Sequence, residues 1–214
     1  MCNLVERLSE IPTTTIANAL DDVGKYLNSP ISIRPVIPRM KMSGRAVTVD
    51  VDVGDGGSFS SDQFRVGSII DAANQGDVIV VAAKGAKASI WGGMASLAAS
   101  LKGISGLVVD GSVRDVDEIE ECGFNVFSRY IVPTTGRSRL NVRSIGEPIL
   151  IEDVSVDPGD IIIGDSTGLV IIPKAEVSNV LDRSIEYQRQ DEMAATEIKA
   201  GVTFSNVMKR FKRI

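Results

Sequence analysis

Hydrophobic and polar positions in the first quarter of the chain recur with spacings that predict a helix, a strand and a second helix. Apolar residues three and four apart predict a helix over 13–22, which Gly24 stops. Between 45 and 53, valines alternate with polar residues, a pattern typical of a strand buried on one face. An apolar stripe at helical spacing predicts a helix from about 61 to 74.

The middle of the chain has a strand–helix–strand–helix pattern. The apolar runs 78–83 and 107–110 predict strands covered on both faces. A helix follows each run, at about 93–102 and from about Asp115, and the first helix has an apolar line formed by Met94, Leu97, Ala98 and Leu101. Parallel strands joined in this way form right-handed crossovers and bind ligands at their carboxyl ends. We therefore expect the chemistry in the loops after these strands.

The last third of the chain is predicted to combine hairpins with a long helix. Short strands at 149–151, 161–163 and 169–172 are separated by Pro-, Gly- and Asp-containing turns. The residues from about 174 to 200 have a strongly helical composition. No linker, repeat or low-complexity tract interrupts the chain, so we predict one mixed α/β domain over 1–214 with a C-terminal helix.

Composition and charge narrow the class of protein. The 214 residues are 43% hydrophobic and carry a net charge of −5, as expected for a soluble globular chain. An isoelectric point near 4.9 and the lack of a basic stripe argue against nucleic acid as a partner. We find no signal peptide and no apolar run long enough to span a bilayer, so we expect no membrane association and a cytoplasmic location.

The chain contains no histidine, which excludes Ser-His-Asp and Cys-His catalysis and histidine-ligated zinc. Acid–base or metal chemistry must therefore use carboxylates, Lys, Tyr, Cys or water. The two cysteines, Cys2 and Cys122, form no CxxC pair and suggest no disulfide scaffold, which fits a reducing compartment. Cys122 follows Ile119 on a helix, and we interpret it as a core residue.

Two glycines open the helix that starts at Gly93 and suggest an anion site. The first turn of a helix presents free backbone N–H groups, and glycine removes the Cβ that would block a ligand. The amides of Gly93, Met94 and Ala95 are therefore candidates for binding a carboxylate. The alternative is that the glycine pair forms an ordinary turn.

A charged cluster follows the next strand. Asp115 and Glu118 are spaced i, i+3 on one helix face and can hold a hard divalent cation, while Arg114 offers a bidentate fork for an oxyanion. Acidic residues in a first helical turn also complement the helix dipole, and a lone arginine often forms a surface ion pair. The turn 54–57 lacks the residues of a phosphate loop, which argues against a nucleotide or methyl-donor site.

These residues together form a recognisable spacing: Gly93, twenty residues, Arg114–Asp115, two residues, Glu118. The spacing resembles the signature of the family that contains 4-hydroxy-4-methyl-2-oxoglutarate aldolase and the regulator of ribonuclease activity A. The flanking segments 15–24, 76–81, 106–111 and 158–168 also resemble that family.

The resemblance implies a three-layer α/β/β fold of the swivelling-domain type, a homotrimer or hexamer, and a site near a subunit interface. It implies a metal-dependent pyruvate lyase that cleaves 4-hydroxy-2-oxo acids or decarboxylates oxaloacetate through a metal-stabilised enolate. Asp115 and Glu118 would then hold Mg²⁺ or Mn²⁺, Arg114 would bind the keto or enolate oxygen as the catalytic residue, and the amides from Gly93 to Ala95 would bind the substrate carboxylate.

The chain also differs from the dedicated aldolases of that family, which carry an aspartate at the position of Gly93. The resemblance implies that Glu118 compensates, and that Glu192 or Glu197 of a neighbouring subunit is a candidate to complete the site. Arg137 and Arg139 are candidates to bind a second substrate carboxylate, or are simply solvated.

A different class of function stays open. Some relatives bind a ribonuclease, so the protein can instead be a non-catalytic regulator of another protein. Loss of Asp115 and Glu118 would mark such a regulator, and the chain keeps both. A third interpretation, a menaquinone methyltransferase, lacks the glycine-rich cofactor loop that it requires. We therefore favour the lyase.

Overall fold

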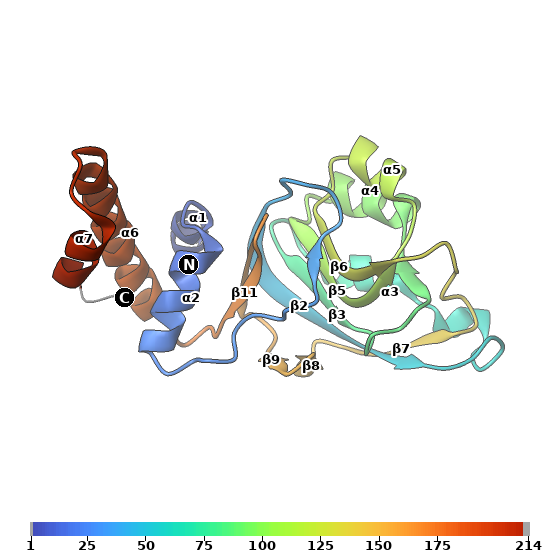
Figure 1. Ribbon diagram of the computed structural model, residues 1–214. Coiled ribbons are helices and arrows are strands. Elements are labelled where there is room, and N and C mark those ends of the chain that lie inside the picture. Colours follow the sequence, from blue (N-terminus) through green and yellow to red (C-terminus); the bar gives the residue numbers. More distant parts are fainter. Residues whose placement is uncertain (1, 212–214) are drawn as a thin grey trace.

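The computed structural model of the protein describes residues 2–211, and its centre is a nine-stranded sheet (Figure 1). The main path through the sheet is β1-β6-β5-β3-β2-β10-β11, with β4 paired to β5 and β7 paired to β2. The strands are β1 (Arg34–Pro35), β2 (Met42–Val53), β3 (Val78–Ala82), β4 (Ser89–Trp91), β5 (Gly106–Val113), β6 (Val126–Ile131), β7 (Leu140–Ile145), β10 (Ile161–Asp165) and β11 (Gly168–Ile172). A separate antiparallel hairpin is formed by β8 (Ile149–Ile151) and β9 (Val154–Val156).

The strand directions confirm the crossover pattern expected for the middle of the chain. Strands β2, β3, β5 and β6 are parallel to one another, and β10 and β11 form an antiparallel hairpin that pairs with β2. Helices lie on both sides of the sheet. On one side are α3, α4 and α5, and beyond β11 on the other are α1, α2, α6 and α7 (Figure 1). The helices are α1 (Cys2–Ser9), α2 (Thr13–Asp22), α3 (Val66–Ala72), α4 (Gly93–Leu101), α5 (Val116–Glu121), α6 (Val177–Lys199) and α7 (Phe204–Phe211).

Two hydrophobic cores share the β10–β11 hairpin. Side chains on one face of the hairpin, such as Ile162 and Ile171, belong to the main core with β2, β3, β5 and α3–α5. Side chains on the other face, such as Ile163 and Val170, pack with α1, α2 and α6. This arrangement explains why both strands of the hairpin are almost continuously apolar.

Two carboxylates hold the connecting segments around these cores in place by accepting hydrogen bonds. Asp165 accepts hydrogen bonds from the backbone N–H and the hydroxyl of Thr13 and so caps α2. Burial acts to raise the pKa of Asp165, but the hydrogen bonds from Thr13, Thr167 and Gly168 outweigh it and lower the pKa. Glu152 accepts from the amides of Ile31 and Ser32, and its pKa is lowered in the same way against the effect of burial.

Three details of the predicted elements are wrong. Strand β2 is covered on both faces at its centre, where Thr48 and Asp50 are buried and where the strand also contacts β8 outside the sheet. The helix expected at 61–74 is split into the 3₁₀ turn η1 (Ser61–Gln63) and α3, because Phe64 and Arg65 leave the helical conformation.

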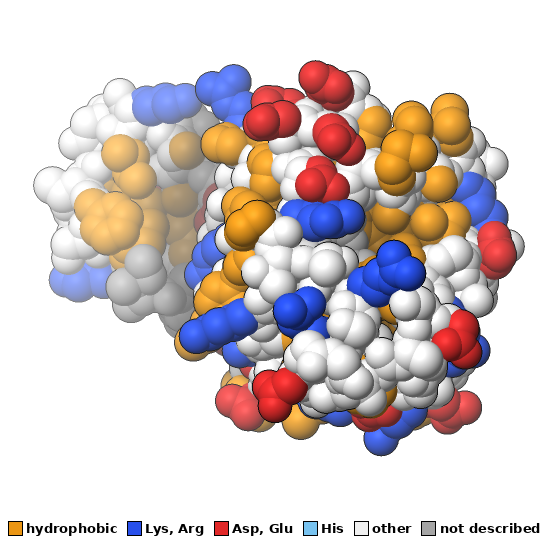
Figure 2. Space-filling view, turned by 90° about the vertical axis from the view of Figure 1, so that its right-hand side faces the viewer, with side chains coloured by type: hydrophobic (Ala, Val, Ile, Leu, Met, Phe, Trp, Pro, Cys, Tyr) orange, Lys and Arg blue, Asp and Glu red, His pale blue; other side chains and the backbone are white. Residues whose placement is uncertain are grey.

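The third correction concerns α4, whose expected apolar line faces outward. Met94, Leu97 and Leu101 are 76%, 43% and 81% exposed, while the buried residues of α4 are Gly93, Ser96 and Ala99. Small residues let α4 approach the sheet closely, which leaves the larger apolar side chains on the surface. Figure 2 shows hydrophobic side chains gathered on this side of the molecule, next to a group of acidic ones.

The following elements were not predicted from the sequence: α1, α7, β1, β4, β6, β7 and β9. No helix within residues 2–211 combines the length and the apolar character that crossing a bilayer requires.

Candidate functional site

The loops after β4 and β5 lie side by side because the two strands are paired. Trp91 at the end of β4 is in register with Val113 at the end of β5, and the backbone N–H of Arg114 donates to the Trp91 carbonyl at 3.0 Å. Gly92 directly follows β4, and Arg114 directly follows β5. The pairing therefore brings the start of α4 against the start of α5.

Asp115 connects the two helix starts. It adopts a left-handed backbone conformation with φ 57° directly before α5, a region in which aspartate is among the few tolerated side chains. Its Oδ2 accepts a hydrogen bond from the Gly93 N–H at 3.2 Å and lies 3.4 Å from Arg114 Nε. The carboxylate is thus held between the first turn of α4 and the Arg114 guanidinium.

The two glycines make room for the protein's own carboxylates. A Cβ at Gly92 would lie 2.4 Å from Asp115 Oδ2, and a Cβ at Gly93 would lie 1.7 Å from Glu118 Oε2. The absent Cβ atoms thus leave room for Asp115 and Glu118, and a role of these glycines in clearing space for a ligand stays a prediction. Because Asp115 occupies the Gly93 amide, the first-turn amides left for a ligand are those of Met94 and Ala95.

Asp115 and Glu118 supply the kind of oxygen ligand that a hard divalent cation prefers. Asp115 and Glu118 both place an oxygen over the Gly92–Gly93 segment, where a Cβ would otherwise lie. Across residues 2–211, no group of three or more His, Cys, Asp or Glu side chains is arranged to hold a metal ion. Mg²⁺ is commonly bound through one or two carboxylates, with water and substrate oxygens completing its shell.

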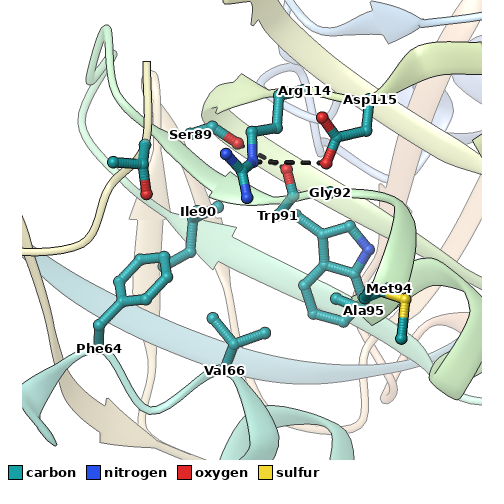
Figure 3. Close-up of a pocket in the computed structure, with 11 residues that line it drawn as sticks. Phe64, Val66, Ser89, Ile90, Trp91, Gly92, Met94, Ala95, Arg114 and Asp115 are labelled. Carbon is teal, nitrogen blue, oxygen red and sulfur yellow. Dashed lines mark hydrogen bonds and ion pairs between the residues drawn. The ribbon is translucent and has the colours of Figure 1, made fainter. Parts of the chain in front are cut away.

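A pocket of about 190 Å³ opens beside this cluster (Figure 3). Arg114 and Asp115 lie along one edge, and Phe64 and Val66 lie along the opposite edge. The lining residues are Phe64, Val66, Ser89, Ile90, Trp91, Gly92, Met94, Ala95, Arg114, Asp115 and Thr135. Of the residues expected from the sequence, Met94, Ala95, Arg114 and Asp115 line the pocket. Gly93 and Glu118 do not line it, although Glu118 of α5 places its carboxylate against Gly93.

Trp91 forms a rigid part of the pocket wall. Its side chain is 2% exposed and stacks on Phe124, with ring centroids 6.1 Å apart. Trp91 Nε1 donates to Ser96 Oγ at 2.9 Å, and Ser96 Oγ donates to the Gly92 carbonyl. These bonds fix the loop that carries the two glycines. Trp91 was not predicted, and its position directly before the glycine pair is the only signal that would have indicated it.

The other candidate cations and carboxylates lie outside this pocket. Arg137 Nε donates to Ser61 Oγ at 2.9 Å, Arg139 Nη1 donates to the Thr135 carbonyl at 3.3 Å, and neither arginine lines the pocket. Glu192 and Glu197 lie on α6, which Figure 1 shows beyond the sheet from α4 and α5. Glu197 accepts a hydrogen bond from Arg210 of α7 at 2.8 Å. A role of either glutamate across a subunit boundary stays a prediction.

The cysteines take no part in the cluster. Cys122 follows α5 directly and packs, half-buried, against the main core. The side chain of Cys2 lies outside the described residues.

Comparison with known proteins identifies the class to which this fold and site belong. The sequence profile of the RraA-like group, described as Aldolase/RraA, matches residues 13–171. The chain therefore belongs to the RraA-like family, as its motif spacing predicted.

Two relatives match almost the whole chain. An uncharacterized protein of Methanocaldococcus jannaschii is 32% identical over 201 residues, which cover 91% of this chain and 89% of the relative. A protein of Halalkalibacterium halodurans named "Putative 4-hydroxy-4-methyl-2-oxoglutarate aldolase" is 32% identical over 201 residues, covering 94% and 90%.

Solved structures share the fold. An uncharacterized protein from Pseudomonas syringae superposes with a TM-score of 0.86 at 24% identity, covering 97% of both chains. Streptomyces coelicolor RraAS2, described as an unusual member of the RNase ES inhibitor RraA family, gives a TM-score of 0.81 at 22% identity, covering 90% of this chain and 96% of its own. These likenesses confirm the mixed α/β fold with its C-terminal helix. The names in this family include both aldolases and inhibitors of a ribonuclease.

Proposed function

We propose that this protein is a divalent-metal-dependent C–C lyase that releases pyruvate from a small 2-oxo acid. The observation that supports the proposal is the meeting of Arg114, Asp115 and Glu118 at the start of α4, beside an open pocket. The names of several relatives support a small-molecule lyase as well.

In this proposal Asp115 and Glu118 hold Mg²⁺ or Mn²⁺. When bound, the cation acts as a Lewis acid for the negative charge that C–C cleavage leaves on the 2-oxo acid. Arg114 donates to the keto oxygen and stabilises that charge further, as a fixed cation at the pocket edge. The amides of Met94 and Ala95 bind the substrate carboxylate at the positive end of the α4 dipole.

The proposed cleavage of a 4-hydroxy-2-oxo acid is a retro-aldol reaction. The C4 hydroxyl of a 4-hydroxy-2-oxo acid gives its proton to water and becomes the carbonyl of the leaving aldehyde or ketone. The C3–C4 bond breaks, its electron pair forms the enolate of pyruvate, and C3 takes a proton from water. With oxaloacetate the same bond breaks, and the C4 carboxylate leaves as CO₂.

We also propose that the protein acts in the cytoplasm as a homotrimer or hexamer, with Glu192 or Glu197 of a neighbouring subunit near the metal. The oligomeric state and the neighbour's glutamate rest on the family resemblance, whereas the location rests on the expected absence of a signal peptide and on the cysteine usage. Mass photometry of the purified protein tests the oligomeric state, and a monomer would remove the neighbour's carboxylate from the mechanism.

The decisive experiment is oxaloacetate decarboxylation by chelator-treated protein, with and without added Mg²⁺ or Mn²⁺, with metal-only and metal-plus-oxalate controls. We expect turnover that requires the metal and is blocked by oxalate, which mimics the enolate. Because Trp91 is the sole tryptophan of the chain and lines the pocket, oxalate binding should also change the intrinsic fluorescence.

Oxaloacetate turnover no higher than with the metal alone, together with no metal-dependent exchange of the methyl protons of pyruvate for deuterium, would refute the lyase and favour the second candidate. That candidate is a regulator of another protein, which the name of the Streptomyces coelicolor structure favours. Inhibition of a purified RNase E-type ribonuclease by the protein would then be measured.

A further inference from the structure

The pocket separates its polar groups from its apolar groups. The charged groups Arg114 and Asp115 lie along one edge, close to the start of α4. The opposite edge is formed by Phe64 and Val66, and Ile90 lies between the two edges (Figure 3). A substrate whose 2-oxo acid end lies at Arg114 therefore directs its distal group toward hydrocarbon.

The pocket also has too few cations for a substrate with two carboxylates. Arg114 is the one cationic side chain among the described residues that line the pocket, and Asp115 adds a negative charge. The 2-oxo acid end of the substrate uses Arg114 in the proposed function. A second carboxylate would then lie against Phe64 and Val66 without a partner, and burying an unpaired charge is strongly unfavourable.

The arginines near the apolar edge form hydrogen bonds with other parts of the protein and do not line the pocket. Arg65 stands between Phe64 and Val66 in the sequence, but its Nη2 donates to the Val142 carbonyl. Arg137 is bound to Ser61, and Arg139 is bound to the Thr135 carbonyl. All three guanidinium groups thus have protein partners, and none of them lines the pocket.

We propose, resting on the lyase function above, that the preferred substrates are 4-hydroxy-2-oxo monocarboxylic acids with an uncharged alkyl group on C4. The products are pyruvate and an aliphatic aldehyde. This class differs from the oxoglutarate-derived dicarboxylate for which several relatives are named. Phe64, Val66 and Ile90 are the residues that determine the specificity.

The test compares substrates that differ only in the distal group. The metal-loaded protein is assayed with 4-hydroxy-2-oxopentanoate, which ends in a methyl group, and with 4-hydroxy-2-oxoglutarate, which ends in a carboxylate. We expect kcat/KM to be more than about tenfold higher for the methyl compound. Lengthening the alkyl group to ethyl and propyl should raise kcat/KM about fourfold per methylene. Equal or faster cleavage of the dicarboxylate would overturn the proposal.

Substitutions of Phe64 and Val66 test whether these residues determine the substrate preference. Phe64→Arg places a cation at the apolar edge and should lower the methyl-to-carboxylate ratio of kcat/KM by about tenfold or more. Val66→Lys is the second variant and should act in the same direction. The matched control is Leu150→Arg, which adds a cation at a residue that is 57% exposed on β8, outside the pocket, and should leave the ratio unchanged. An unchanged ratio in both folded wall variants would contradict the assignment of these residues.

An independent measurement separates this proposal from the lyase function. Metal-dependent exchange of the methyl protons of pyruvate for deuterium needs no distal group. Exchange together with a preference for the dicarboxylate overturns the substrate class alone. Absence of both this exchange and oxaloacetate turnover overturns the lyase function itself.

Discussion

Replacing Gly93 with alanine is the sharpest test of how the two helix starts fit together. A Cβ at this position would lie 1.7 Å from Glu118 Oε2, 2.6 Å from Glu118 Cβ and 2.7 Å from Glu118 Cδ. A rotation of the Glu118 side chain removes the contacts with Oε2 and Cδ. It does not remove the contact with Cβ, so α4 and α5 must move apart.

Gly93→Ala has two opposite effects on the free energy of unfolding. Overpacking of this kind costs about 1–3 kcal/mol. Alanine in place of glycine in a helix returns at most about 1 kcal/mol. Gly93→Ala should therefore lower the free energy of unfolding by about 1–2 kcal/mol. In the background Glu118→Gly, which lacks all three clashing atoms, the same substitution should instead raise it by up to about 1 kcal/mol.

The assay is a double-mutant cycle measured by urea unfolding at one fixed protein concentration, since association would shift the midpoint. Trp91 fluorescence and far-UV circular dichroism should give coincident transitions. Gly67→Ala in α3 is the matched control, because no heavy atom lies within 4 Å of its added Cβ, and it should be neutral or stabilising. A coupling energy between positions 93 and 118 below about 0.5 kcal/mol would refute the reasoning.

Three further predictions concern the site and the pH dependence of stability. Asp115→Asn keeps a side chain that tolerates φ 57° but removes the charge, so metal-dependent turnover should fall by more than about 100-fold while the far-UV spectrum is retained; full activity would remove Asp115 from the metal site. Arg114→Ala should lower kcat by about 100-fold or more even at saturating metal, and a change in KM alone would show that Arg114 only binds substrate. Because the pKa of Asp165 is lowered by the bonds from Thr13, its stabilising contribution is complete above the ordinary pKa of 3.8 and is lost as the pH falls through the lower folded value. Asp165→Asn should thus cost about 1 kcal/mol at pH 7 and much less at pH 2, as measured by urea unfolding, whereas an equal cost at both pH values would contradict this account.

The order of β3, α4, β5 and α5 around the site was predictable because each of these four elements carries a local signal, whereas β4 carries none that we used. Glycine turns bound the apolar runs of β3 and β5, and the carboxyl ends of parallel strands lie at one edge of a sheet. This reasoning placed Gly93 near Arg114 and Asp115 without any knowledge of the distances. The roles of these residues came from the resemblance to a known family, because local sequence signals do not indicate what a residue does.

The rest of the pocket could not be predicted for equally physical reasons. Phe64 and Val66 reach the site through a break between η1 and α3, where the apolar stripe had predicted a continuous helix. Thr135 comes from a loop that carries no strand or helix signal. The orientation of α4 was wrong because periodicity shows where large apolar residues gather, whereas Ser96 and Ala99 are the residues that face the sheet.

The hairpin between the two cores has a consequence for where this protein can be cut. The match to the family profile ends at residue 171, within β11, so all of α6 lies beyond the matched residues. Val177, Val180 and Leu181 of α6 belong to the same core as the outer face of β10 and β11, but α1 and α2 lie between α6 and that hairpin. A chain truncated after β11 would uncover the apolar side chains of α1 and α2 that pack with α6, a surface that invites self-association. We therefore expect that the part matched by the family profile does not fold stably without α6, which completes the second core around α1 and α2.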